Sequence, residues 1–169
     1  GTTVTNIGMS PATAGTATGL NVGAGSRLTR MKRLSYRVTT AATSVLTLAG
    51  VDAEPLRSRE HVLVSTLFGE AWKAGRDLDL AGLIAQVQAP PIGKIGVLDL
   101  ESFFPAKDRF GLAMQLNQLL AAPGFAAWLQ GDPLDVDRLL FGTRGKPQVS
   151  VISIAHLDDQ ERMFFVSLL

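Results

Sequence analysis

Apolar residues recur at three- and four-residue steps between residues 28 and 48, and this spacing constrains the fold more than any other feature of the chain. The residues that share the spacing are Leu28, Met31, Leu34, Val38, Ala41, Val45 and Leu48. Such a pattern places one apolar stripe along a helix, and Gly50 follows where a helix of this kind usually ends. The sequence therefore predicts one long amphipathic helix whose apolar face needs a partner.

Further helices follow along the chain. One is expected from about Leu56 to Trp72, with Gly75 as its stop and with an inward face made by Leu56, Leu63, Leu67 and Ala71. A short helix capped by Asp77 or Asp79 ends before the prolines at 90 and 91, and another runs from Pro105 to Ala121. Two more are predicted over 125–129 and 132–141. The apolar run within residues 92–105 is compatible with a strand, but the proline and glycine that flank it favour an ordered loop.

These patterns divide the chain into three parts. Residues 1–25 form a Gly- and Thr-rich segment with one or two short strands, at Thr2–Ile7 and Leu20–Val22. Residues 26–141 form a helical block of about six helices. In residues 142–169 a buried strand at Gln148–Ala155 precedes a helix that enters at Gln160, with Asp158 or Asp159 as its cap. No stop signal follows that last apolar run, which suggests a piece cut from a longer protein.

Composition excludes several classes of function. The chain has 169 residues, which suits one ordinary domain, and 46% of them are hydrophobic against 18% charged. It has no cysteine, so disulfides, cysteine nucleophiles and thiolate metal sites are excluded. Two histidines are too few for a histidine-built metal centre. No apolar run is long enough to span a membrane, and a soluble, cytoplasmic protein is expected.

Charge is distributed unevenly although the net charge is only +1. Residues 1–51 contain no acidic residue and carry five cations, whereas the remainder carries eleven cations and fifteen acids. On a helix, Arg30, Arg33 and Arg37 share one stripe beside the apolar face, and Lys32 lies on the other flank. Stacked guanidinium groups suit successive phosphates or a carboxylate surface, so this stripe is the candidate phosphate or DNA contact. The alternative is that the cationic helix lies against the acidic remainder of the same protein.

Other candidate motifs lack the sequence context that nucleotide, metal or acid–base chemistry requires. A phosphate loop is absent from the sequence: Gly93-Lys94 and Gly145-Lys146 lack the required context. Asp99 and Glu101 are better explained as caps for the Pro105 helix than as magnesium-binding acids. The acids after His156 are better explained as helix caps than as a metal or acid–base cluster. His61 shares a helix edge with Phe68 and Trp72, and is expected at the boundary of the core.

Three stretches together resemble the HerA-like ATPases, relatives of the HerA and FtsK family of ring-forming DNA motors. They are Glu54–His61 (EPLRSREH), Asp99–Val136 (DLESFFPAKDRFGLAMQLNQLLAAPGFAAWLQGDPLDV) and Gly145–Leu169 (GKPQVSVISIAHLDDQERMFFVSLL). Their order and spacing also fit, and weaker matches at Pro11–Val22 and Arg33–Gly50 extend the resemblance to most of the chain.

The resemblance implies the middle of a motor domain. The expected fold is mainly α with a few strands: a helical insertion block between two strands, Thr2–Ile7 and Gln148–Ala155, of an incomplete RecA-like α/β P-loop NTPase core. The family's phosphate loop would precede this segment and its acidic magnesium strand would follow it, so no catalytic or nucleotide-binding residue is carried over. ATP and Mg would belong to the parent, a hexameric ring of like subunits acting on DNA, and no cofactor is expected for this chain alone.

Two alternatives remain open at the level of the sequence. The chain is either part of such a motor or a self-contained helical protein-interaction or DNA-binding module derived from that family. A motor fragment is expected to expose apolar surface at its last helix, around Met163, Phe164, Phe165 and Leu168, and therefore to self-associate. A self-contained module is expected to be monomeric, with that helix packed.

Overall fold

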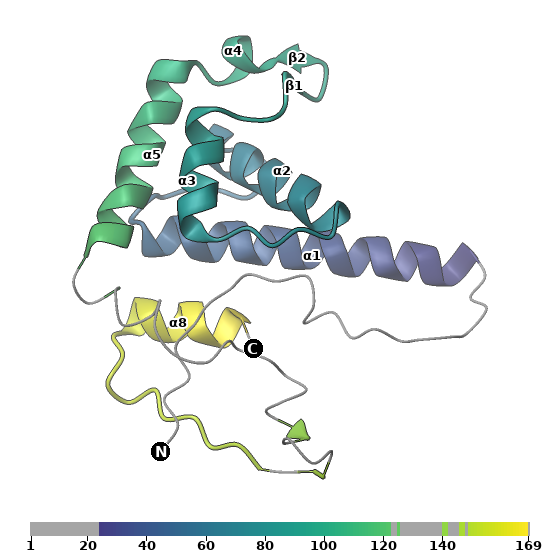
Figure 1. The fold of residues 1–169 in the computed structure, drawn as a ribbon, viewed down its shortest axis with the longest axis vertical. Coiled ribbons are helices and arrows are strands. Elements are labelled where there is room, and N and C mark those ends of the chain that lie inside the picture. The colour runs from purple at the N-terminus through teal and green to yellow at the C-terminus, as the bar shows by residue number, and fades with distance from the viewer. Residues whose placement is uncertain (1–23, 123–124, 126–139, 142–145, 148, 169) are drawn as a thin grey trace.

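The computed structural model describes residues 24–122, 125, 140–141, 146–147 and 149–168. In this part the chain is mainly helical, as predicted, with one small antiparallel hairpin (Figure 1). The predicted strands at Thr2–Ile7 and Leu20–Val22 lie outside the described residues. So do the predicted helices over 125–129 and 132–141, apart from single positions.

The long helix α1 spans Ala24–Leu48 and organises the fold. Helix α2 (Arg59–Lys73) packs on one side of it, and α8 (Asp159–Leu168) packs on another, so α8 lies across α1 from the rest of the bundle (Figure 1). Helix α3 (Leu80–Gln88) packs against α2 and against α5 (Ala106–Ala121). The predicted periodicity of α1 is confirmed for Val38, Ala41 and Val45, which are buried. The prediction is wrong for Met31, which is 64% exposed because the N-terminal half of α1 extends past the other helices (Figure 1).

Two glycines end helices in the way the sequence predicts. Gly50 and Gly75 have φ of 72° and 68°, a left-handed backbone that glycine adopts without steric cost. After each, an N–H bonds back to the carbonyl five residues earlier: Val51 to Leu46 at 2.8 Å, and Arg76 to Ala71 at 2.9 Å. This is the Schellman arrangement, which satisfies carbonyls that the helix end leaves open.

Helix α2 begins later than predicted. Leu56 was expected on its inward face, but it is 85% exposed and has φ of 67°. Pro55 and Leu56 occupy the two central positions of a turn closed by the Arg57 N–H on the Glu54 carbonyl, at 3.2 Å. Proline first and a positive φ second define a type II turn, and such a turn cannot continue into the helix. The apolar spacing alone did not reveal it.

The predicted ordered loop over 92–105 contains more regular structure than expected. Strands β1 (Lys94–Ile95) and β2 (Leu98–Asp99) form a two-residue hairpin in which Lys94 faces Asp99 and Ile95 faces Leu98. Helix α4 (Leu100–Phe103) follows directly and leads into α5. A single long strand, the other structure compatible with the sequence, is excluded because Gly96 turns the chain with φ of 60°.

The predicted strand at Gln148–Ala155 is wrong for the residues that the structure describes. Residues 149–155 have no strand partner there and run as irregular chain into α8 (Figure 1). The run has the β-branched composition of a strand, but a ladder also requires a neighbouring strand. The described residues hold no parallel sheet, and the hairpin of β1 and β2 is their one sheet.

The core joins all the larger helices. Leu63, Leu67 and Phe68 of α2 are fully buried, as are Leu83 of α3 and Leu116 of α5. Among the described side chains of α8, Phe165 belongs to the core: it was expected on an exposed surface but is only 7% exposed. That expectation is wrong for Phe165 because α8 packs against α1, whereas Met163 is 71% exposed as predicted. The side chains of Phe164 and Leu168 lie outside the described part.

Candidate functional site

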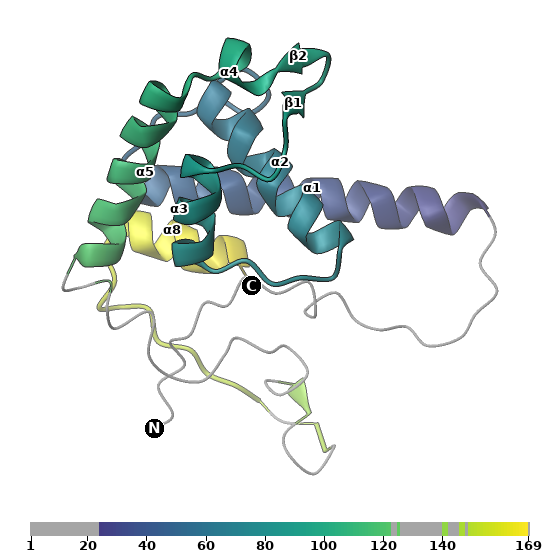
Figure 2. The ribbon, with the colours of Figure 1, turned by 45° about the horizontal axis from the view of Figure 1, so that its top comes forward.

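The basic stripe predicted from the sequence, Arg30, Arg33 and Arg37, lies in the N-terminal half of α1. Figures 1 and 2 show this half extending past the other helices, so it has few neighbours in the fold. Arg33 is exposed and Arg37 is half-buried. The backbone of Arg30 is helical, and its side chain lies outside the described part.

Arg37 defines which side of α1 the stripe occupies. Its guanidinium carbon lies 5.8 Å from the ring centroid of Trp72 on α2, a cation–π distance. Trp72 is itself held by Phe68, whose ring centroid lies 5.4 Å away, and it is only 8% exposed. Arg37 therefore contacts a buried aromatic pair, and Arg33 lies one turn nearer the N-terminus on the same side of α1.

Two further cations, which sequence reasoning did not single out, follow this contact along the chain. Lys73 comes directly after Trp72 and Arg76 three residues later, and both are exposed. Lys73 is paired with Glu70 at 3.0 Å, and the exposed acid Asp77 follows Arg76, so the positive charge at the end of α2 is partly balanced.

Helix α1 carries no acidic residue from Ala24 to Leu48. Its N-terminal end therefore combines several cations with the positive end of the helix dipole, an arrangement that costs helix stability and favours an anion. Among the described residues, Arg33 makes no ion pair. The alternative in which the stripe lies against the acidic part of the same chain therefore finds no support at Arg33.

His61 is buried, contrary to the expectation of a boundary position. It is 1% exposed and lies between α1 and α2, with Nε2 3.0 Å from the Thr43 hydroxyl and Nδ1 3.2 Å from the Ser65 hydroxyl. Thr43 donates its only hydroxyl hydrogen to the Thr39 carbonyl at 2.9 Å, so its oxygen accepts from Nε2–H. Ser65 then donates to Nδ1, and a neutral imidazole is fully satisfied.

This environment shifts the titration of His61. Burial lowers the pKa of the imidazole below its ordinary value of 6.5, and a hydrogen bond to the Thr39 carbonyl opposes part of the shift. The contacts that account for His61 are two hydroxyls and one carbonyl, with no nucleophile–base–carboxylate chain among them. Its role is to join α1 to α2.

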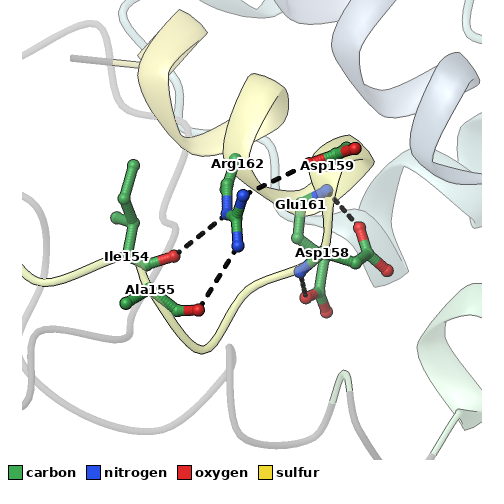
Figure 3. A network of polar contacts seen from close by, with 6 residues as sticks. All are labelled: Ile154, Ala155, Asp158, Asp159, Glu161 and Arg162. Carbon is green, nitrogen blue, oxygen red and sulfur yellow. Dashed lines mark hydrogen bonds and ion pairs between the residues drawn. The ribbon is translucent and has the colours of Figure 1, made fainter.

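The acids after His156 cap α8, as the sequence predicts (Figure 3). The Glu161 N–H donates to Asp158 Oδ1 at 2.8 Å, and the Asp158 N–H donates to Glu161 Oε2 at 3.0 Å. This reciprocal pair is a capping box, so Asp158 is the cap rather than Asp159. Asp159 instead pairs with Arg162 at 3.2 Å, and His156 is exposed.

Glu101 also has the capping role expected of it. Its carboxylate accepts from the N–H of Ala106, the first residue of α5, at 3.0 Å, and it pairs with Arg109 at 2.7 Å. The hydrogen bond from Arg109 holds the pKa of Glu101 below its usual range. Arg109 is 4% exposed and donates also to the Phe104 carbonyl at 2.6 Å. Asp99 lies outside this network and faces Lys94 at 3.8 Å.

Neither acidic cluster forms a metal site: the described residues contain no group of three or more His, Asp or Glu side chains suited to hold an ion. None of the described helices is both long enough and apolar enough to cross a membrane. Comparison with models of protein families, with curated protein sequences and with solved structures finds no match. Because His61 and the acidic clusters have structural roles, the basic stripe on α1 remains as the candidate functional site among the described residues.

Proposed function

We propose that this chain is part of a HerA-like, ATP-driven DNA-translocating motor and that it contacts DNA phosphates through the stripe of Arg30, Arg33 and Arg37. The observation that carries the site is the exposed Arg33 on a projecting helix without acidic residues, with no ion pair among the described residues. Support for the motor comes from the three stretches that resemble the HerA-like ATPases and from the helical character of residues 24–121.

In this proposal the helical block is an insertion between two strands of a RecA-like core, and the parent assembles as a cytoplasmic hexameric ring. ATP and Mg bind the parent rather than this chain, which contains no phosphate loop. The chain alone therefore neither binds nor hydrolyses ATP, because stabilising the transferred phosphoryl group needs groups it lacks. Hydrolysis of ATP by the purified chain would contradict the proposal.

The spacing of the stripe supports phosphate contact rather than base recognition. Three arginines at intervals of three and four residues present planar, bidentate donors in a row, which suits successive phosphates. Tyr36, 74% exposed and three residues after Arg33 on α1, is the one aromatic residue within this stretch, and a single ring does not make the interleaved series that stacking of successive bases needs. We therefore expect binding that depends on salt and hardly on sequence.

The test is the affinity for a fluorescent DNA duplex, measured by anisotropy over a series of salt concentrations. Contact with two or three phosphates predicts a slope of log K against log salt of about −2 to −3. Arg33→Glu should lower the affinity roughly three- to tenfold and make the slope shallower by about one. The matched control is Lys107→Glu, the same charge reversal at an exposed position on α5.

Equal losses of DNA affinity in the Arg33→Glu and Lys107→Glu variants would mean that only the net charge of the protein matters. The stripe would then not be the DNA-binding site. The motor itself is tested separately by sequencing the source gene on both sides of this segment. The proposal expects a phosphate loop before the segment and a strand ending in acids after it, in the same reading frame. A frame without them would remove the motor and leave the DNA contact to be judged by the binding data.

A further inference from the structure

Tyr36, the only tyrosine of the chain, lies on the projecting half of α1 and is 74% exposed. Within the residues that the structure describes, no hydrogen bond or ring contact involves it. By contrast, the rings of Phe68, Trp72 and Phe104 are buried, and each contacts a neighbouring ring or guanidinium group. The ring of Tyr36 therefore adds little to the core and presents its faces to water.

Two exposed cations lie beside this ring. Lys32 and Arg33 precede Tyr36 by four and three residues, the spacing at which helix side chains are neighbours with Cβ atoms about 5–6 Å apart. Neither cation makes an ion pair in the described part of the chain. Val38, two residues after Tyr36, is buried, so the helical period turns all three side chains away from the core.

A ring between two cations suits one part of an unpaired nucleic acid strand. The face of an aromatic ring stacks on any base, while lysine and arginine donate to phosphate oxygens. In a duplex each base is stacked between its neighbours and paired at its edge, so a side chain on the surface of a helix reaches the phosphates only. In a single strand a base can turn out of the stack and lie on an aromatic side chain.

We infer that the basic site on α1 selects single-stranded over duplex DNA, because Tyr36 stacks on one unpaired base while Lys32 and Arg33 contact the adjoining phosphates. This inference rests on the proposed DNA contact and specifies its substrate. Arg33 serves both forms of DNA, whereas Tyr36 contributes only where a base is unpaired. Stacking on one ring reads no base edge, so the binding remains nearly independent of sequence. Figures 1 and 2 show that the other helices leave this end of α1 open to a strand.

The test compares two probes, a fluorescent oligothymidylate and a duplex of the same length, by anisotropy with the full chain at one salt concentration. Tyr36→Ala should weaken binding of the single strand about five- to tenfold and leave the duplex affinity unchanged. Tyr36→Phe keeps the ring and should bind both probes as the wild type does. Phe110→Ala is the matched control, since Phe110 is an exposed aromatic residue on α5, and it should change neither affinity.

Arg33→Glu separates this inference from the proposed function, because it should weaken binding of both probes. If it does so while Tyr36→Ala weakens neither, or weakens both equally, Tyr36 does not select single strands and the inference fails, whereas the phosphate contact stands. A loss in Tyr36→Phe as large as in Tyr36→Ala would mean that the hydroxyl acts rather than the ring, and would also overturn the inference. If Arg33→Glu changes neither affinity, the phosphate contact fails and the inference fails with it.

Discussion

At the scale of single residues, the buried His61 shows how a polar group is accommodated in this core. A histidine between two helices costs little when both ring nitrogens have partners, and here Thr43 and Ser65 supply them. The arrangement fits the neutral ring only. A proton added at Nδ1 would face the hydrogen that Ser65 donates, and burial would disfavour the charge.

The buried neutral ring of His61 predicts how the free energy of unfolding depends on pH. Because the folded-state pKa of His61 lies below the unfolded value of 6.5, the unfolded state binds more protons on acidification. The contribution of the neutral ring is complete above about pH 6.5 and is lost as the pH falls toward the folded pKa. Urea unfolding at a series of pH values should show this decline, and His61→Gln should flatten it.

The chain offers a matched control, because its other histidine, His156, is exposed. His156→Gln should keep the decline below pH 6.5 that the wild type shows. If His156→Gln removed the decline and His61→Gln retained it, the assignment of the pH dependence to the buried ring would be wrong.

At the scale of elements, the helices with the clearest local signals were the ones that the sequence predicted well. The side chain of Asp79 caps α3 by accepting from the Gly82 N–H at 2.7 Å, and Gly50 and Gly75 end their helices. These signals act within a few residues, so sequence alone contains them. The strand expected at 148–155 depends on a partner far along the chain or on another chain, and local propensity carries no information about that partner.

The same distinction applies to the candidate site. Arg33 and Arg37 were placed on one side of a helix by counting residues, which needs only the helical period. The contact of Arg37 with Trp72 joins positions that are 35 residues apart in the sequence. Only the packing of α2 on α1 creates it. The burial of His61 was missed for the same reason.

The capping box of α8 leads to a prediction at this scale. Asp158→Ala should lower the free energy of unfolding by about 1 kcal/mol, because the Glu161 N–H loses its acceptor at the helix start. Asp159→Ala is the control: Asp159 is 96% exposed and pairs only with Arg162, so its loss should cost less than about 0.5 kcal/mol. Denaturant unfolding of both variants measures the difference, and equal costs would contradict the assignment of Asp158 as the cap.

At the scale of the whole molecule, α1 is shared between two packing partners. Helix α2 covers one side of it, where His61 meets Thr43 and Trp72 meets Arg37, and α8 packs on another. The chain between α5 and α8 is long, so the position of α8 depends on its packing against α1. The stability of the whole bundle should therefore respond to a change in α8.

Phe165→Ala tests this dependence. Removing a buried phenyl ring should lower the free energy of unfolding by about 3 kcal/mol, with the loss shared by contacts on α1. Met163→Ala, on the exposed side of the same helix, should cost less than about 0.5 kcal/mol. Thermal unfolding followed by circular dichroism separates the two. A small loss for Phe165→Ala would mean that α8 is not part of the cooperative core.

The pairing of α1 with α8 also sets an order of events during synthesis. The ribosome completes α1, α2, α3 and α5 before α8 emerges, since more than a hundred residues separate Leu48 from Asp159. Until α8 has been synthesised, the part of the α1 surface that α8 covers is therefore exposed in the nascent bundle. Closing so long a loop is slow compared with forming the local helices. During that interval, the uncovered part of α1 is the surface that a chaperone would have to shield.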